Sequence, residues 1–385
     1  MANSVRQLYM KVKDSHELTL LAGEQGLDNL VRWIHTVESL DMSDFLHGNE
    51  MTFTTGVGLK KEEDLFNLIK QNVKNSASGM IVNIGPFIKN ITPEMIAYCN
   101  EHHFPLFSVP WHIYLADVIR IFTYELLQSE KKETELTKAI KGAIFDQNNI
   151  DEYLIILDKY GYEENNQYCI TAFQMLESDE NTLLNLKKRM ENSLVKENHA
   201  FISFLLDVKL IIVFINDTED HISSIINRLF HDLSYEYKDL FAGIGANQSA
   251  IFNIKNSYTQ ATKVLDLIKK SVIKKPIGLY NELDFLKLLL PINDLEALRD
   301  YKNEKLYQLE KYDELNNTKY LQTLECYLNN NCSINQTAKE LFVHRNTINY
   351  QISRIAQILD HNLSSFKTRC DLYLAIQIKN YLEVS

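Results

Sequence analysis

The sequence predicts a multidomain chain in which α/β regions are followed by an all-α region. Short apolar runs alternate with helical stretches over residues 18–115 and again over 167–290, whereas residues 318–385 contain no Pro and no strand alternation. The length of 385 residues accommodates two to four domains at roughly 100–200 residues each. We therefore expect an N-terminal α/β domain, a central ferredoxin-like or nucleotide-cyclase-like α+β domain, and a C-terminal helix-turn-helix bundle.

The first region, residues 1–115, is predicted to be an α/β domain with some parallel strand pairing, because strands and helices alternate along it. Thr92 and Pro93 supply an N-cap and a proline at the first helical position. The predicted strands are Leu18–Leu21, Val31–Val37, Met51–Thr54, Met80–Ile84 and Leu106–Val109, and the predicted helices are Asp64–Val73 and Pro93–His102.

Residues 116–165 are predicted to form a connecting helical region. Apolar residues recur there at helical spacing, and the charged segment Ser129–Glu135 interrupts them. This pattern fits a dimerising helix and fits equally well a helix packed on its own domain. The predicted stripe consists of Ile119, Phe122, Leu126, Leu136 and Ile140.

The central region, residues 166–292, is predicted to follow the order β-α-β-β-α-β, with Asp207–Val208 as a two-residue hairpin turn. A further helix is expected over residues 250–270. The predicted strands are Tyr168–Met175, Ala200–Leu206, Leu210–Ile215 and Phe241–Ala246, and the predicted helices between them are Glu180–Glu197 and His221–Tyr237.

Within residues 315–385, the segment Asn335–Ile355 carries the pattern of a helix-turn-helix. Ser333 and Gln336 predict a capped short helix with a capping box, Phe342-Val343 a turn, and a second helix begins near His344. Arg and Asn at the start of such a helix can each make two hydrogen bonds to a base edge in the major groove. The predicted inward stripe is Ile348, Ile352, Ile355 and Leu359, and the predicted DNA-binding residues are His344, Arg345, Asn346, Thr347, Asn349, Tyr350 and Arg354.

The charge is divided unevenly along the chain. The whole chain has a formal net charge of −11, which argues against a general nucleic-acid or membrane-surface binder. Residues 318–385, however, hold seven Lys and Arg against five Asp and Glu, a net charge of +2, which leaves −13 for the first 317 residues. The prediction of DNA binding therefore depends on the motif, and the charge only permits it.

The string AKELFVHRNTINYQISRI resembles the C-terminal helix-turn-helix of PucR/CdaR-type bacterial transcription regulators, whose closing helix here is Arg369–Tyr381. The turn also resembles that of Fis-type nucleoid proteins. Asn349 and Gln351 stand where the family usually has arginines, so fewer phosphate contacts and a shallower salt dependence are expected.

The resemblance extends over most of the chain. Residues 243–267 resemble the central GGDEF-like domain of that family, and Leu18–Trp111 resembles its N-terminal PucR domain, which implies an effector-binding role. Ligands of open α/β sheets lie beyond the carboxyl ends of the strands. There we expect a flat, polar, nitrogen-rich metabolite, as the purine or amino-acid inputs implied by the resemblance would be. The candidate ligand-binding residues are Thr54, Thr55, Gly56, Asn83, Gly85 and Trp111.

Catalysis is not expected. The hairpin FLLDVKLII has no Gly and a single acid, Asp207, and the strand before it has no carboxylate, so a nucleotide–magnesium complex would lack ligands. His102 and His103 are adjacent and cannot share one helix face, and Gly243-Ile244-Gly245 is more typical of a strand end than of a phosphate site. We expect no cofactor, no metal and no catalytic residue.

The sequence contains no apolar run of about 18 residues and no signal-peptide pattern, so a cytoplasmic protein without a membrane segment is expected. Its five scattered cysteines predict reduced, buried thiols. The function that follows is a sequence-specific, DNA-binding transcription regulator that responds to a small metabolite and acts as a homodimer or higher homo-oligomer on a double-stranded operator. The alternative is a small-molecule sensor or enzyme whose C-terminal helices make only protein contacts.

Overall fold

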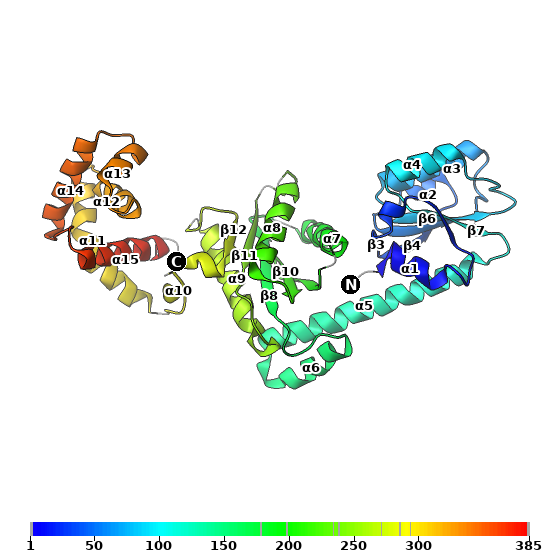
Figure 1. Cartoon of the computed structure of the whole chain (residues 1–385), viewed down its shortest axis with the longest axis horizontal. Coiled ribbons are helices and arrows are strands. Elements are labelled where there is room, and N and C mark those ends of the chain that lie inside the picture. Colours follow the sequence, from blue (N-terminus) through cyan, green and yellow to red (C-terminus); the bar gives the residue numbers. More distant parts are fainter. Residues whose placement is uncertain are drawn as a thin grey trace. The chain divides into compact units, whose positions relative to one another are not determined.

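The computed structural model describes residues 3–177, 179–197, 199–233, 235–237, 239–270, 272–284, 286–292 and 294–382. The chain divides into two compact units (Figure 1). The first comprises Met1–Leu240 and Ala246–Thr259, and the second comprises Phe241–Gly245 and Gln260–Ser385. Each unit is described by itself.

The first unit begins with a five-stranded sheet in the order β2-β7-β6-β5-β4. Strands β4 to β7 are parallel to one another, and β2 is antiparallel to β7. Neighbouring parallel strands are consecutive in the chain, so the carboxyl ends of β4 to β7 lie at one edge of the sheet. The strands are β2 Thr19–Ala22, β4 Trp33–Thr36, β5 Glu50–Thr54, β6 Gly79–Ile84 and β7 Leu106–Pro110.

Helices cover both faces of this sheet (Figure 1). Helices α2 (Leu40–Ser43), α3 (Glu62–Lys74) and α4 (Pro93–Glu101) connect the parallel strands and lie on one face, where α3 and α4 share a core with β6. Helix α1 (Val5–Val12) and the start of α5 (Leu115–Phe145) cover the other face. Burial on both faces explains why β6 and β7 are mainly apolar.

Most predicted elements of this domain are confirmed to within two residues, and Thr92 caps α4 as predicted by accepting a bond from the Met95 amide at 3.3 Å. The prediction of one strand over Val31–Val37 is wrong. Its first part is β3 (Leu30–Val31), which pairs with β1 (Asn3–Ser4) in a separate two-stranded sheet, whereas β4 pairs with β5. The two parts of the segment therefore belong to different sheets, and Arg32 lies between them.

The predicted connecting helix is confirmed as α5, whose 31 residues span about 46 Å at 1.5 Å per residue. The predicted interruption of its apolar stripe by the charged segment is also confirmed, since no residue between Phe122 and Leu136 is buried. Acids of this segment pair with cations of other elements. Glu133 lies 2.6 Å from Lys187 Nζ, and Glu135 lies 2.6 Å from Lys159 Nζ. The residues buried along α5 are Val118, Phe122, Leu136, Ala139, Ile140, Ala143 and Ile144. Both halves of the helix are therefore packed within this unit.

The rest of the first unit contains an antiparallel three-strand arrangement in which β10 pairs with both β8 and β9. Asp207 adopts a left-handed conformation (φ 51°) in the predicted hairpin turn. The predicted order of elements is observed, while the ferredoxin-like and GGDEF-like descriptions stay predictions. The elements of this part are α6 Ile150–Lys159, β8 Tyr168–Met175, α7 Glu180–Lys196, β9 Phe201–Leu206, β10 Lys209–Ile215 and α8 Glu219–Leu233. Of the elements that follow, β11 Leu240–Ile244 (except Leu240) and β12 Ile277–Leu279 belong to the second unit, and α9 Ile254–Lys269 is divided between the two units after Thr259.

The second unit contains β11 and β12, which pair in parallel, and a helical bundle. Leu306 and Leu309 of α11 are fully buried in the same core as Ile355 of α14 and Leu372 of α15. The helical core therefore includes residues ahead of position 315. The helices are α10 Leu286–Leu289, α11 Leu295–Asn316, α12 Tyr320–Asn329, α13 Ile334–Glu340, α14 Arg345–Leu359 and α15 Phe366–Leu382.

Within the described ranges, no helix combines the length and apolar character that crossing a bilayer requires. The five cysteines are free; Cys99, Cys169 and Cys326 are buried, and Cys332 and Cys370 are partly exposed.

Burial makes a testable difference among these thiols. It raises the pKa of Cys99 and of Cys169 to about 12. At pH 8 both stay protonated, and because the thiolate is the nucleophile we expect their reaction to be roughly 1,000-fold slower than that of an exposed thiol. Alkylation at pH 8 followed by mass spectrometry should label Cys332 and Cys370 first. The raised pKa also means that the folded protein binds these two thiol protons more tightly than the unfolded chain does. The free energy of unfolding should therefore fall as the pH rises from about 9 toward 12. Labelling of Cys99 as fast as Cys370 in the folded protein would contradict this burial.

Candidate functional site

The predicted helix-turn-helix is formed by α13 and α14. Ser333 is the N-cap of α13, where its hydroxyl accepts the amide of Gln336 at 3.4 Å, the N-cap half of the predicted capping box. Thr337 and Ala338 are buried, so α13 packs on the bundle through one side. The short helix thus holds the following turn in a fixed place.

The turn is closed by two backbone bonds and contains a left-handed residue. The Phe342 amide donates to Lys339 O, and the Val343 amide donates to Ala338 O at 3.0 Å. Phe342 has φ 55° and is 95% exposed. A positive φ is strained at a bulky residue. The two backbone bonds stabilise this conformation of Phe342, and the chain turns there into α14.

Helix α14 buries one stripe and exposes the rest. Ile348, Ile355 and Leu359 are buried and Ile352 is partly buried, which confirms the predicted inward stripe. All seven predicted DNA-binding residues are exposed at the start or on the outer side of this helix: His344, Arg345, Asn346, Thr347, Asn349, Tyr350 and Arg354.

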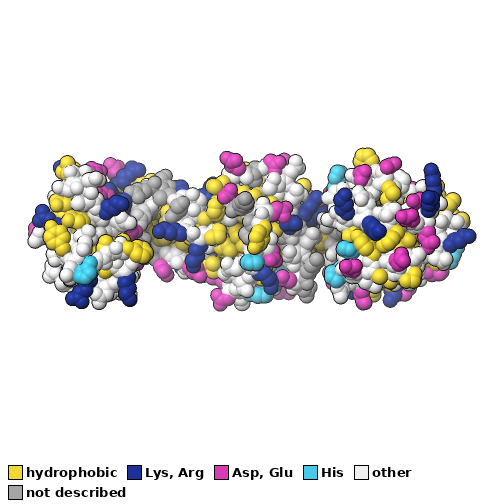
Figure 2. All heavy atoms as spheres, turned by 90° about the horizontal axis from the view of Figure 1, so that it is seen from above, with side chains coloured by type: hydrophobic (Ala, Val, Ile, Leu, Met, Phe, Trp, Pro, Cys, Tyr) yellow, Lys and Arg dark blue, Asp and Glu magenta, His cyan; other side chains and the backbone are white. Residues whose placement is uncertain are grey.

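The first turn of α14 is capped by a histidine. His344 is the N-cap, and its Nδ1 accepts the Asn346 amide at 3.2 Å. The amides of Thr347 and Ile348 donate to the His344 carbonyl. The positive end of the helix dipole at this turn favours a phosphate. Lys and Arg side chains are spread over the visible face of this helical domain (Figure 2).

Arg354 differs from the other six residues because it is already tied to the protein. Its guanidinium lies 5.7 Å from the centre of the Tyr312 ring and donates to Gln357 Oε1 at 3.0 Å. Its hydrogen bond with Tyr312 of α11 also raises the pKa of Arg354. Tyr312 was not predicted, since it lies 42 positions from Arg354 and no local pattern links the two.

The predicted ligand-binding residues gather at the carboxyl edge of the N-terminal sheet, but the donors of the first three face a carboxylate of the chain itself. Glu38 accepts bonds from the hydroxyls of Thr54 (3.1 Å) and Thr55 (2.9 Å) and from the amides of Thr55 (3.0 Å) and Gly56 (3.0 Å). Glu38 was missed because its partners lie 16–18 residues further along the chain.

The other three candidates lie at the ends of β6 and β7. Asn83 donates to the carbonyls of Val109 (3.3 Å) and Pro110 (3.1 Å). A Cβ atom at Gly85 would lie 2.5 Å from the Trp111 ring, so a glycine is required where this indole crosses the end of β6. Trp111 remains 45% exposed.

Two hollows lie beside these residues. One of about 550 Å³ is lined by the ends of β6 and β7 together with Lys13, Glu17 and Thr19. The other, of about 290 Å³, is lined by the segments 59–62 and 87–90, which include Lys60, Lys61 and Lys89. The larger one has the size usual for a small-molecule site.

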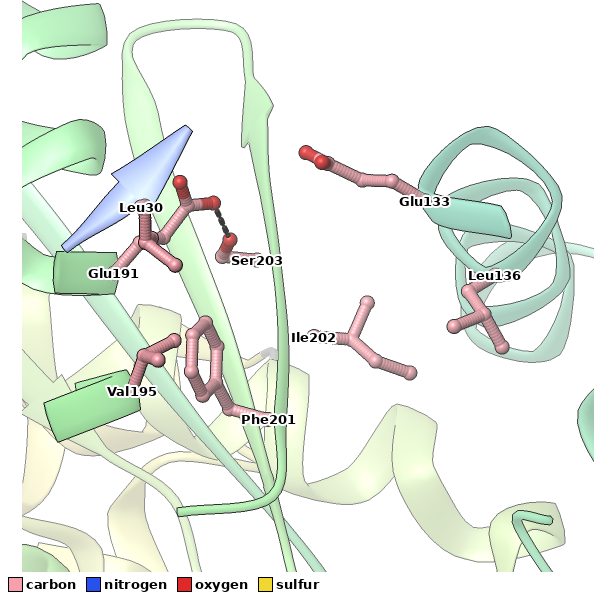
Figure 3. Close-up of a pocket in the computed structure, with 8 residues that line it drawn as sticks. All are labelled: Leu30, Glu133, Leu136, Glu191, Val195, Phe201, Ile202 and Ser203. Atoms are coloured by element: carbon pink, nitrogen blue, oxygen red, sulfur yellow. Dashed lines mark hydrogen bonds between the residues drawn. The ribbon is translucent and has the colours of Figure 1, made fainter. Parts of the chain in front are cut away.

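A further cavity, between α5, α7 and β9, is too small for a metabolite (Figure 3). Its volume of about 20 Å³ is that of roughly one water molecule. Ser203 donates to Glu191 on its wall, and Glu191 also pairs with Arg32 and with Lys187 at 3.3 Å. Burial by itself would raise the pKa of the nearby Glu133, but Lys187 brings it below its ordinary value. This cluster is therefore a buried ion-pair network.

Comparison with known proteins identifies both ends of the chain. Residues 9–126 match the purine catabolism regulatory protein-like family, and residues 320–378 match the PucR C-terminal helix-turn-helix domain. The second match includes α13, the turn and α14.

Relatives include two regulators of Bacillus subtilis (strain 168). The proline-responsive transcriptional activator PutR is 25% identical over 75% of this chain and 70% of its own length. The purine catabolism regulatory protein is 20% identical over 97% of this chain and 99% of its own length. A solved structure, the regulator of polyketide synthase expression from Bifidobacterium adolescentis, is 14% identical with a TM-score of 0.30, and the match covers 65% of this chain and 99% of that one.

The Glu38 contacts predict a specific cost of mutation. Glu38→Ala leaves the amides of Thr55 and Gly56 without this acceptor, and we expect the free energy of unfolding to fall by about 1–3 kcal/mol. Glu101→Ala, at an exposed position near the end of α4, should change it by less than about 0.5 kcal/mol. Urea unfolding followed by circular dichroism compares the two variants, and an equal effect of both would show that the Glu38 bonds contribute nothing.

Proposed function

We propose, from the premise that both ends of this chain are those of a PucR-type transcription regulator, that it binds a specific operator as a homodimer through α14. A small metabolite at the carboxyl edge of the N-terminal sheet then changes how the two α14 helices are presented. Regulation of transcription by DNA binding is the function common to the matched domains and relatives.

The exposed side of α14 is the observation that carries the DNA-binding proposal. Arg345 stands at the first helical position, where a guanidinium can reach two acceptors of guanine. Asn346 and Asn349 offer the amide geometry that pairs with adenine. Thr347 and Tyr350 offer hydroxyls that bond to phosphates and fix the register of the helix on the duplex.

A dimer follows from the size of the module. A single helix-turn-helix makes too few contacts for specific binding, and such domains usually occupy paired half-sites. The middle of α5 supports an interface between copies, because Tyr124 and Leu127 are exposed there on a helix whose two ends are packed.

The effector proposal is supported by the chemistry of the larger hollow. Lys13 and Glu17 place a cation and an anion on its wall, and Ser108 and Thr19 add hydroxyls, a set that suits a small polar or zwitterionic metabolite. The relatives are named for proline and for purine catabolism. We propose an amino-acid-related or purine-related effector in this hollow, whose lining includes Pro110, the residue next to the half-exposed Trp111.

Arg345→Ala tests the role of α14. Loss of a bidentate base contact costs about 1–3 kcal/mol per subunit, so two copies should lose at least roughly 30-fold in affinity. The footprint of the full chain on its operator should disappear, while the oligomeric state measured by sedimentation should be unchanged.

Lys74→Ala provides the control, since Lys74 is an exposed cation at the end of α3, on the sheet face opposite α5 and outside the DNA-binding domain. Its footprint should be that of the wild type. A wild-type footprint by Arg345→Ala would refute the assigned role. Absence of salt-dependent DNA binding by the wild type would favour the rival function, in which the C-terminal helices make protein contacts only.

The two tryptophans allow a test of the effector site, because the chain has only Trp33 and Trp111. Titration with proline and with purine derivatives should change the fluorescence of Trp33→Phe, in which Trp111 is the reporter. The same titration of Trp111→Phe should leave its fluorescence unchanged and weaken binding, measured by calorimetry, at least 10-fold. Equal responses from both variants would place the effector elsewhere.

A further inference from the structure

Two histidines and an aspartate converge at the end of the central strands of the first unit. His199 precedes β9, Asp217 follows β10, and His221 lies in the first turn of α8. One donor atom from each lies within 4.8 Å of the other two. Asp217 Oδ2 is 3.1 Å from His199 Nδ1, and Asp217 Oδ1 is 2.7 Å from His221 Nδ1.

The second nitrogen of His199 is also occupied. Its Nε2 lies 3.3 Å from Glu197 Oε2, and Glu197 is itself paired with Arg228. The side chains of His199 and Asp217 are only 8% and 14% exposed. A neutral imidazole has one N–H, so it can donate to one of these carboxylates but not to both.

We propose that His199, Asp217 and His221 bind a divalent transition-metal ion of the zinc type. A cation at the Nδ1 side of His199 is shared with Asp217, and the remaining Nε2–H then donates to Glu197. This is the usual arrangement of a metal-bound histidine, whose second nitrogen donates to a carboxylate that orients the ring. Asp217 then binds the cation, and Glu197 accepts the Nε2–H of His199.

The geometry is close to what an ion needs. Two donor atoms around a tetrahedral zinc lie about 3.4 Å apart, since each Zn–N or Zn–O bond is about 2.0–2.1 Å. The nitrogen–oxygen distances are 3.1 Å from His199 Nδ1 to Asp217 Oδ2 and 2.7 Å from His221 Nδ1 to Asp217 Oδ1, so the second pair must separate further than the first to hold an ion. His221 is more than half exposed and free to make that movement. The Asp217 carbonyl accepts Asn247 Nδ2 at 2.8 Å, which fixes the backbone that carries the carboxylate.

The donor set also selects the kind of ion. Two imidazoles and one carboxylate suit zinc, nickel or cobalt, whereas magnesium and calcium require a shell of oxygens. The fourth position faces the exposed side of His221 and is left to water. Bound there, the ion ties the chain before β9 to the start of α8.

The test uses the full chain freed of metal with a chelator and titrated with Zn²⁺ by calorimetry, with Mg²⁺ as the comparison ion. We expect one Zn²⁺ per chain, a raised melting temperature and no response to Mg²⁺. His221→Gln should weaken Zn²⁺ binding at least 10-fold. His231→Gln, on the same helix but outside the cluster, should bind as the wild type does.

Cobalt gives a second readout, because four- or five-coordinate Co²⁺ in a protein site absorbs visible light much more strongly than aqueous Co²⁺ does. The wild type and His231→Gln should show this absorption and His221→Gln should not. Since His221 is exposed, His221→Gln is expected to fold, which circular dichroism checks. No Zn²⁺ binding by the wild type, or equal binding by His221→Gln, would overturn the proposal, the second outcome placing the ion on other groups such as the thiols.

Discussion

Burial of one apolar stripe decides which side of α14 can meet a partner. Ile355 and Leu359 pack into a small core together with residues of α11, α12 and α15, and Ile348 is buried on the same side of α14, so the helix cannot rotate without exposing these side chains. Burial of such a side chain contributes about 1.5–3 kcal/mol, which is more than the outward polar residues could recover by turning inward. The outer face is therefore fixed before any DNA is present, and binding need not spend free energy on ordering the helix.

Local periodicity explains what the sequence could predict. The stripe of α14, the cap at Ser333 and the Thr92-Pro93 helix start involve residues within eleven positions of one another, so the spacing alone identifies them. The pattern predicts one strand over Val31–Val37 because no Gly, Pro, Asn or Asp lies within it. Its division depends on β1, a two-residue strand some thirty positions earlier whose pairing with β3 no local pattern announces.

The same limit applies to the sites. Glu38 and the Thr54–Gly56 turn, and Tyr312 and Arg354, are pairs that only the folded chain brings together. His199 and His221 are separated by a hairpin, and only the return of β10 alongside β9 places them at one end of the sheet. Sequence spacing can predict a site on the surface of one helix, because its residues recur at helical intervals. It cannot predict a site assembled from the ends of several strands, whose residues lie far apart in the chain.

The charge of the chain constrains how its DNA-binding domain must work. A net charge of +2 over residues 318–385 gives little long-range attraction to DNA, and the preceding residues carry −13. Of the residues exposed on α14, most are amides and hydroxyls, whose bonds act only at contact and depend weakly on salt. In the proposed dimer, affinity comes from short-range complementarity together with linkage, because a second helix-turn-helix held in register makes the second contact an intramolecular event. An effector that changes the distance between the two α14 helices would therefore change the affinity for DNA without changing the base contacts that each helix can make.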